Sequence, residues 1–336
     1  MNEAHVPFVE TRFRIFDAYL ASLNQNSYHK FVRMYPQEFE ELHRHLYPKL
    51  VHAATHLGPI GTRHRLAVFL RYAGHGGTWT QLSGEFSIGS STASAIVREV
   101  ATAIIDVLPS QTRLPSAHGS KWMAALSGFR RSTNYPAAMG ALDGKHIALV
   151  RPSESGSLYY NYKGYYSIVL LALVDADYRC IIYDLGAKGR SSDAGVFSRS
   201  EMKRFLEDHD DDFPSPQPYS QVEASKDIKC AHFNLVHSRA RRVVENYFGI
   251  LANRFRILMR EITANPAAAK QITLAIMILH NLLVDSVGAE VAVQRYGLSE
   301  PAQEAEQPGV SGNVSYNSKT TRDVLKEYFA RRDGLL

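Results

Sequence analysis

The sequence predicts an α/β protein in which a mixed sheet flanked by helices follows an all-α N-terminal region. Before residue 134 apolar residues recur at helical spacing, whereas after it short continuous apolar runs alternate with turns. The chain has 336 residues, 45% hydrophobic and 21% charged, which is enough for a buried core and more than one domain.

The first predicted region, residues 1–61, is helical and is punctuated by Pro36 and Pro48. His52 and His56 are four residues apart, a spacing that suits a metal ligand pair. No glutamate lies between them and no third ligand suggests itself. We therefore interpret them as a solvated or locally bonded pair.

The second predicted region, residues 62–115, contains three helices: "TRHRLAVFLRYAG", "TWTQLSGEFSIG" and "SSTASAIVREVATAIIDVLP". Thr78 or Thr80 is expected to cap the second helix, and Ser90 or Ser91 the third. Three helices with a tight turn before the last are typical of a helix-turn-helix unit, and a plain three-helix packing unit is the alternative. The third helix would offer four polar side chains to a DNA groove: Ser91, Thr92, Ser94 and Arg98.

The net charge of +5 is unevenly distributed. Residues 62–131 carry eight Lys or Arg against three Asp or Glu, and residues 226–270 carry nine against three. Residues 201–212 show the reverse, six acids against two bases. Basic blocks of this kind suit a polyanion such as DNA, with ordinary solvated faces as the alternative.

The predicted strands follow residue 134. "PAAMGALDG" and "HIALVRP" are expected to be short strands separated by a turn at Gly144, and "YYSIVLLALVDAD" and "RCIIYDLGAKG" to be the next two strands. Asp143 interrupts the first apolar run. Because a buried, unpaired carboxylate is costly, it needs a partner: Lys145, His146 or a metal ion.

Helices are expected again after the strands. "SSDAGVFSRSEMKRFLED" opens with a Ser192/Asp193 cap, and "SRARRVVENYFGILANRFRIL" predicts an amphipathic helix that carries Arg241 and Glu245 one turn apart. Residues 207–233 between them show no clean period and are expected to be an irregular loop, which is unusually long for a compact domain. Residues 286–336 are expected to be a flexible tail closed by a short helix, "TRDVLKEYFARR".

Cys180 and Cys230 form no CxxC pattern, which predicts a reducing, intracellular compartment without a disulfide framework. The first thirty residues show no apolar segment typical of a secretory signal. The longest strictly apolar run, Ile168–Val174, is too short to span a membrane.

Four stretches of the chain resemble a known family: "ALDGKHI", "SGSLYYNYKGYYSIVLLALVDADYRCIIYDLGAKGRSSDAGVF", "SRARRVVENYFGILANRFRIL" and "ILHNLL". They are similar to PIF/Harbinger transposases, and more so to the Harbinger transposase-derived nucleases of animals. The similarity covers about residues 60–285 in the same order. It implies a DDE-type, RNase H-like nuclease domain at residues 130–285 after the helical DNA-binding region.

The resemblance also implies the chemistry. The family's first catalytic carboxylate corresponds to Asp143 and its last to Glu245, both as ligands of Mg²⁺ or Mn²⁺. Such ions activate the attacking water and stabilise the leaving oxygen in phosphodiester hydrolysis. Lys145 and His146 would contact DNA phosphates. The alternative is a structural ion pair of the carboxylates with Lys145 or Arg241.

The family's second aspartate follows a fourth strand, and the corresponding interval here is the irregular stretch at 207–233. The sequence therefore predicts a sheet that lacks this strand and its aspartate. Asp184, which is expected to end the third strand, and Asp193 are the candidate substitutes, while Asp175 ends the second strand. The acidic run Asp210–Asp212 is interpreted as solvated.

Three hypotheses follow: a divalent-metal-dependent DNA nuclease, a DNA-binding remnant of a domesticated transposase that does not cut, and a truncated product without a stable core. We expect a nuclear protein, with the cytoplasm as a further location. Beyond DNA, the resemblance implies a Myb/SANT-like DNA-binding protein as partner, and we expect no membrane association.

Overall fold

The computed structural model describes residues 16–53, 59–109, 120–136, 138–208, 218–297 and 316–335. The chain divides into two compact units. Unit 1 comprises Met1–Gln111, Ile147–Ile168 and Leu251–Leu282, and unit 2 comprises Thr112–His146, Val169–Ile250 and Leu283–Leu336. Each unit combines segments that are far apart in sequence, whereas the ranges predicted from the sequence are contiguous.

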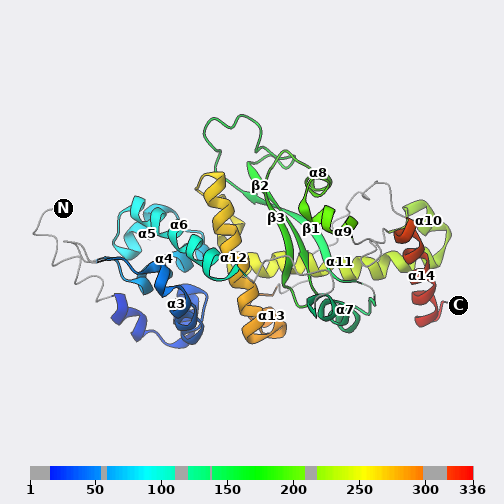
Figure 1. The fold of residues 1–336 in the computed structure, drawn as a ribbon, viewed down its shortest axis with the longest axis horizontal. Helices are drawn as coiled ribbons and strands as arrows, with labels where there is room; N and C mark the ends of the chain where they lie inside the picture. The colour runs from blue at the N-terminus through cyan, green and yellow to red at the C-terminus, as the bar shows by residue number, and fades with distance from the viewer. Residues whose placement is uncertain are drawn as a thin grey trace, which may run out of the picture. The chain divides into compact units, whose positions relative to one another are not determined.

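The helices of unit 1 pack around α4 (Figure 1). They are α2 (Gln25–Val32), α3 (Pro36–Leu50), α4 (Thr62–His75), α5 (Trp79–Phe86), α6 (Ser90–Val107) and the 3₁₀ turn η3 (Arg256–Met259). Residues 65–70 of α4 are all buried, as expected for a helix surrounded by others. The helix ends where Gly76 adopts the left-handed conformation, with φ of 66°.

The helices expected over residues 62–108 are present as α4, α5 and α6, and their caps can be assigned. Thr78 caps α5, because its side chain accepts a hydrogen bond from the Gln81 amide while the Gln81 side chain accepts one from the Thr78 amide. The cap of α6 differs from the expectation: Gly89 is the N-cap and Ser90 already lies in the helix, without a side-chain cap.

Unit 2 contains most of the three-stranded antiparallel sheet, in the order β1–β2–β3. The strands are β1 (Ala141–Ala148), β2 (Ser167–Val174) and β3 (Cys180–Lys188). A mixed sheet was expected. In the described residues the only parallel pairing is a single bridge between Leu149 and Ile262 at the end of β1. Parallel strands need a crossover connection, and the described residues supply no fourth strand for one.

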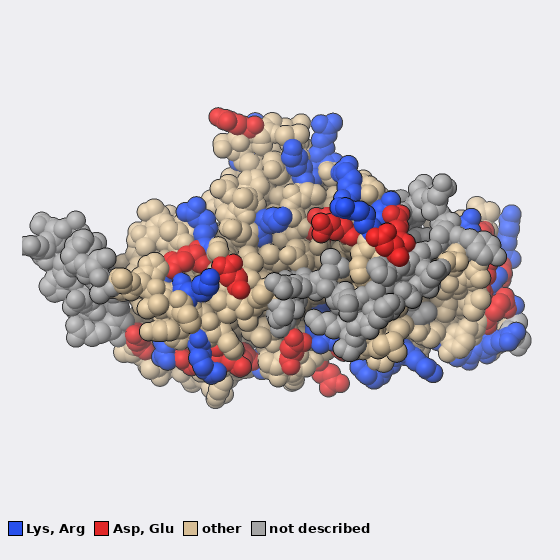
Figure 2. Space-filling model, viewed as in Figure 1, with Lys and Arg blue, Asp and Glu red and all other residues tan. Residues whose placement is uncertain are grey.

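The helices of unit 2 cover the sheet and extend beyond it (Figure 1). They are α7 (Ser120–Thr133), α8 (Asp193–Phe197), α9 (Glu201–Asp208), α10 (Gln221–Lys226), α13 (Ala289–Tyr296), α14 (Tyr316–Arg332) and most of α11 (Ile228–Arg254). α11 and α12 (Pro266–Val287) contribute residues to both units. Acidic and basic side chains mix over α8 and α9, as in the pair Lys203–Glu207 at 3.1 Å (Figure 2).

The predicted irregular loop at 207–233 is wrong over its described part. Residues 221–226 form α10 and residues 228–233 begin α11, and Cys230 is buried in α11, not in a polar loop. Ser220 and Glu223 form a capping box, which starts α10 although no apolar period marks it. Residues 209–217, which include the acidic run Asp210–Asp212, lie outside the described residues.

The flexible tail expected at 286–336 is also wrong for the residues described there. α13 packs Ala292 and Tyr296 against Ile250 and Leu283. α14 is longer than the predicted closing helix and packs its fully buried Phe329 against Phe233 of α11. Three polar pairs join α14 and the residue after it to α11 and to the residues before α10: Tyr219–Asp323, Lys229–Glu327 and His232–Asp333.

α12 is long and apolar enough to cross a membrane by length and composition, but 72% of its apolar window is buried within the protein. Buried core helices of globular proteins have the same character. Cys180 and Cys230 are both free and buried. His52, one of the spaced histidine pair, bonds Glu99 at 2.7 Å, and His56 lies outside the described residues.

Three histidines, one buried and two partly buried, predict acid sensitivity. Burial lowers the pKa of His64 and of His237 to about 4, with the nearby Arg241 adding to the effect on His237, and burial with Arg71 and Arg33 lowers that of His75 to about 4. The unfolded chain therefore binds protons that the folded chain excludes, and stability falls as the pH drops from about 6.5 towards 4.

For His237 we expect His237→Gln to reduce the dependence of unfolding free energy on pH by up to about one proton in this range. Urea unfolding at several pH values measures it, with exposed His45→Gln as the matched control. An unchanged pH dependence in His237→Gln would contradict the assignment.

Candidate active site

Asp143 and Glu245 come together because α11 packs on one face of β1. Side chains alternate along a strand, so Asp143 and Lys145 share a face. On α11, Arg241, Glu245 and Phe248 share a face at helical spacing. Two contacts join these faces: Arg241 Nη2 lies 3.9 Å from Asp143 Oδ1, and Lys145 Nζ lies 5.7 Å from the centre of the Phe248 ring.

The surroundings of Glu245 disfavour the ionised form of its carboxyl. Burial raises the pKa of its carboxyl, and the Asp143 carboxylate raises it further, while Arg241 and Arg242 act in the opposite direction. Asp143 itself is only 14% exposed. Two carboxylates that repel each other in a partly buried place favour a bound cation.

The alternative is a structural ion pair between Asp143 and Arg241, and its geometry is weak. The Asp143–Arg241 distance of 3.9 Å is at the limit for an ion pair, and the Arg241 side chain is 36% exposed. An ion pair of that length and exposure contributes little to stability. Arg241 therefore does not remove the repulsion that raises the pKa of Glu245.

A divalent cation fits this pair in part. Both side chains offer the hard oxygen ligands that Mg²⁺ and Mn²⁺ prefer. Within the described ranges, however, no group of three Asp, Glu, His or Cys side chains could hold a metal ion. Asp143 and Glu245 thus supply two of the three carboxylates implied by the resemblance.

Asp193 lies on the other face of β1. A Cβ atom added to Gly144 would come within 2.4 Å of the Asp193 carboxyl carbon. Gly144 follows Asp143 in the strand, so its absent side chain points away from the Asp143 face. Ser192 is the N-cap of α8 and Asp193 its first helical residue. The structure does not bring Asp193 to the Asp143–Glu245 pair.

The expected turn at Gly144 is wrong, and the contact with Asp193 gives the reason for the glycine. β1 runs unbroken from Ala141 to Ala148. The Asp193 carboxylate occupies the volume that a side chain at position 144 would take, which accounts for the glycine without a turn of the backbone.

Asp184 lies within β3, which continues to Lys188, so the expectation that it ends the third strand is wrong. β2 lies between β1 and β3. Strands pair about 4.8 Å apart, so Asp184 and Asp143 project from strands about 10 Å apart. The structure does not bring Asp184 to the pair either.

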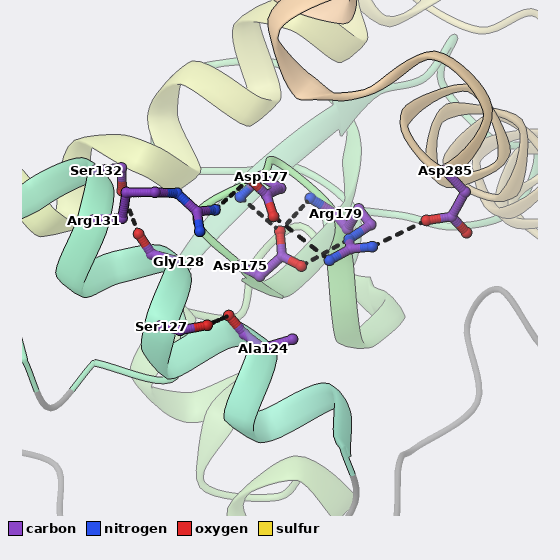
Figure 3. A network of polar contacts seen from close by, with 9 residues as sticks. All are labelled: Ala124, Ser127, Gly128, Arg131, Ser132, Asp175, Asp177, Arg179 and Asp285. Carbon is purple, nitrogen blue, oxygen red and sulfur yellow. Dashed lines mark hydrogen bonds and ion pairs between the residues drawn. The ribbon is translucent and has the colours of Figure 1, made fainter.

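Asp175 belongs to a separate network, in which the guanidinium of Arg179 supplies the positive charge (Figure 3). Arg179 Nε donates to Asp175 Oδ2 at 2.8 Å and Arg179 Nη1 to Asp285 Oδ1 at 3.1 Å. Burial raises the pKa of Asp175, and Arg179 partly offsets the rise. With Asp177 also within 3.7 Å of Arg179, this cluster fixes the β2–β3 turn. We interpret it as structural.

The predicted DNA-contacting residues fall into separate places. On α6, Ser91, Thr92 and Arg98 are exposed and Ser94 is half-buried. Glu99, the neighbour of Arg98, is held by Arg65 and His52. On β1, the alternation of side chains puts Lys145 on the α11 face and His146 on the opposite face.

In a comparison with known protein families, residues 142–281 match the family model of the DDE superfamily endonuclease. The chain is 24% identical over 226 residues to the Homo sapiens protein described as "Putative nuclease HARBI1", covering 61% of this chain and 62% of that protein. It is 23% identical over 226 residues to the Bos taurus protein of the same description. No solved structure matches.

The alignment thus spans less than two thirds of these relatives. The predicted resemblance to Harbinger transposase-derived proteins is confirmed, and the matched family region contains both Asp143 and Glu245.

Because charge on Glu245 is unfavourable, we expect Glu245→Gln to raise the melting temperature near pH 7 in a chelating buffer. The gain should shrink as the pH falls through the raised pKa of the folded carboxyl, and it should be gone below the ordinary glutamate value of 4.5, where the folded and unfolded carboxyls are both protonated. Differential scanning fluorimetry over this pH range measures it, beside exposed Glu261→Gln as control. A lower melting temperature for Glu245→Gln at every pH would instead identify a stabilising ion pair.

Proposed function

We propose that this chain, through its DDE superfamily endonuclease region at residues 142–281, is a transposase-derived DNA nuclease that hydrolyses phosphodiester bonds. The observation that carries the proposal is the meeting of Asp143 and Glu245 within that region, where each makes a charge on the other unfavourable.

In this proposal Asp143 and Glu245 would hold a Mg²⁺ or Mn²⁺ ion, which would supply an activated water and charge neutralisation at the leaving oxygen. The chain's own residues position the carboxylates. β1 fixes Asp143, and α11 fixes Glu245 together with Arg241, which lies beside Asp143 and offers a guanidinium to a phosphate. Lys145 on the same face is a further phosphate contact.

The second candidate function is DNA binding without cleavage. It is favoured by one observation: in the part of the chain that the structure describes, the site has two carboxylates and no third. A DNA-binding remnant would contact DNA through the exposed side chains of α6. It would act in the nucleus, together with a partner such as a Myb/SANT-like DNA-binding protein.

Cleavage of supercoiled plasmid in Mn²⁺ or Mg²⁺ separates the two functions. For a nuclease we expect Asp143→Asn and Glu245→Gln each to lower the rate by on the order of a hundredfold or more. Asp184→Asn and Asp193→Asn, which carry the same chemical change away from the pair, should retain it. No cleavage by the wild-type chain, with DNA binding intact, would establish the second function.

The proposed role of α6 has its own test. Arg98→Ala should weaken duplex DNA binding and lower the slope of log affinity against log salt by about one, because one phosphate contact is lost. Fluorescence anisotropy at several salt concentrations measures this, with exposed Arg44→Ala as control. Equal losses in both variants would remove α6 from the DNA interface.

A further inference from the structure

The segment between β1 and β2 exposes aromatic rings beside cations. We name residues 150–166, "VRPSESGSLYYNYKGYY", the tyrosine loop; it contains five tyrosines and lies at the top of Figure 1. Tyr162 is 81% exposed, more than any other described tyrosine, and Tyr160 is 46% exposed. An aromatic ring this exposed at the tip of a loop has a face on which a nucleotide base can stack.

The tip of the loop is held in one conformation. Asn161 is buried, and its Nδ2 donates to Ser167 Oγ at 2.9 Å. Its Oδ1 accepts from the amides of Lys163 at 2.9 Å and Tyr165 at 3.3 Å. Gly164 completes the turn at φ of 86°, where other residues are strained. The Tyr162 and Lys163 backbone is thus positioned before any ligand binds, which reduces the entropy cost of binding.

Cations accompany the rings. Lys163 Nζ lies 5.5 Å from the centre of the Tyr162 ring, and the Arg151 guanidinium lies 5.8 Å from that of Tyr166. Glu154 is the one acid in the loop. Figure 2 shows acidic as well as Lys and Arg side chains over this part of the molecule. An exposed ring next to an ammonium matches one nucleotide, because the base stacks on the ring while the phosphate pairs with the cation.

We propose that the tyrosine loop binds unpaired nucleotides of DNA, with a base stacked on Tyr162 and a backbone phosphate contacted by Lys163. A base in a duplex has both faces covered by its neighbours, so this geometry selects a strand whose bases are unstacked. The inference rests on the proposed function for the identity of the polymer, DNA, but not on cleavage.

The test uses the full chain in a chelating buffer, where cleavage does not contribute. The probe is a single-stranded oligothymidylate with one central 2-aminopurine, whose fluorescence is quenched when the base stacks. We expect the wild-type chain to quench it, and Tyr162→Ala to lose the quenching and bind about 5- to 100-fold more weakly. Tyr162→Phe should retain both, because it keeps the ring.

Two controls complete the design. Tyr47→Ala removes another exposed tyrosine, 49% exposed and outside the loop, and should bind like the wild type. Lys163→Gln should keep the quenching but lower the salt dependence of affinity by about 0.7, the value for one phosphate of a single strand. Melting temperatures of all variants verify folding.

Two outcomes would overturn the proposal. One is binding and quenching by Tyr162→Ala equal to those of the wild type. The other is a wild-type chain that leaves the 2-aminopurine fluorescence unchanged, as expected if the loop contacts a protein. Either result leaves the nuclease proposal standing, since plasmid cleavage in Mn²⁺ is measured separately with Asp143→Asn.

Discussion

The packing of α11 on one face of β1 determines the electrostatics of the candidate site. It brings Glu245 to Asp143 and places Arg241 Nη2 3.9 Å from Asp143 Oδ1, and the pKa of Glu245 is raised by burial and by Asp143 in spite of Arg241. The helix can hold this position because its fully buried Val244 and Tyr247 pack in the core. Repulsion between the acids is thus maintained by apolar packing, as in sites that bind a cation.

The alternation of side chains along β1 divides the possible carboxylates into those that can join this pair and those that cannot. Asp143 faces α11, whereas Gly144 faces Asp193 of α8. Strand order separates Asp184 from the pair in the same way, since β2 intervenes. In the described residues Asp143 and Glu245 therefore meet without a third carboxylate that could hold a metal ion with them.

The sequence predicted those parts of the fold that depend on local patterns. The periodicity of apolar residues predicts the helices of residues 62–107 and the buried strand at 167–174. It also predicts that Glu245 and Arg241 share one helix face. The errors arose where long-range packing decides. β1 is unbroken at Gly144, where Asp193 packs against it, and α14 is a helix whose Phe329 packs against Phe233 of α11. The capping box Ser220–Glu223 was a local signal for α10 that periodicity alone does not detect.

Titration of the protein with Mn²⁺ tests the central claim, that Asp143 and Glu245 form a cation site, most directly. Water proton relaxation or calorimetry would follow the wild-type chain, Asp143→Asn, Glu245→Gln and the opposite-face control Asp193→Asn. The account predicts one Mn²⁺ bound by the wild type and by Asp193→Asn, with affinity lowered at least about tenfold in the other two variants. Equal Mn²⁺ affinity in all four proteins would contradict it and leave the pair as a structural feature of the α11–β1 contact.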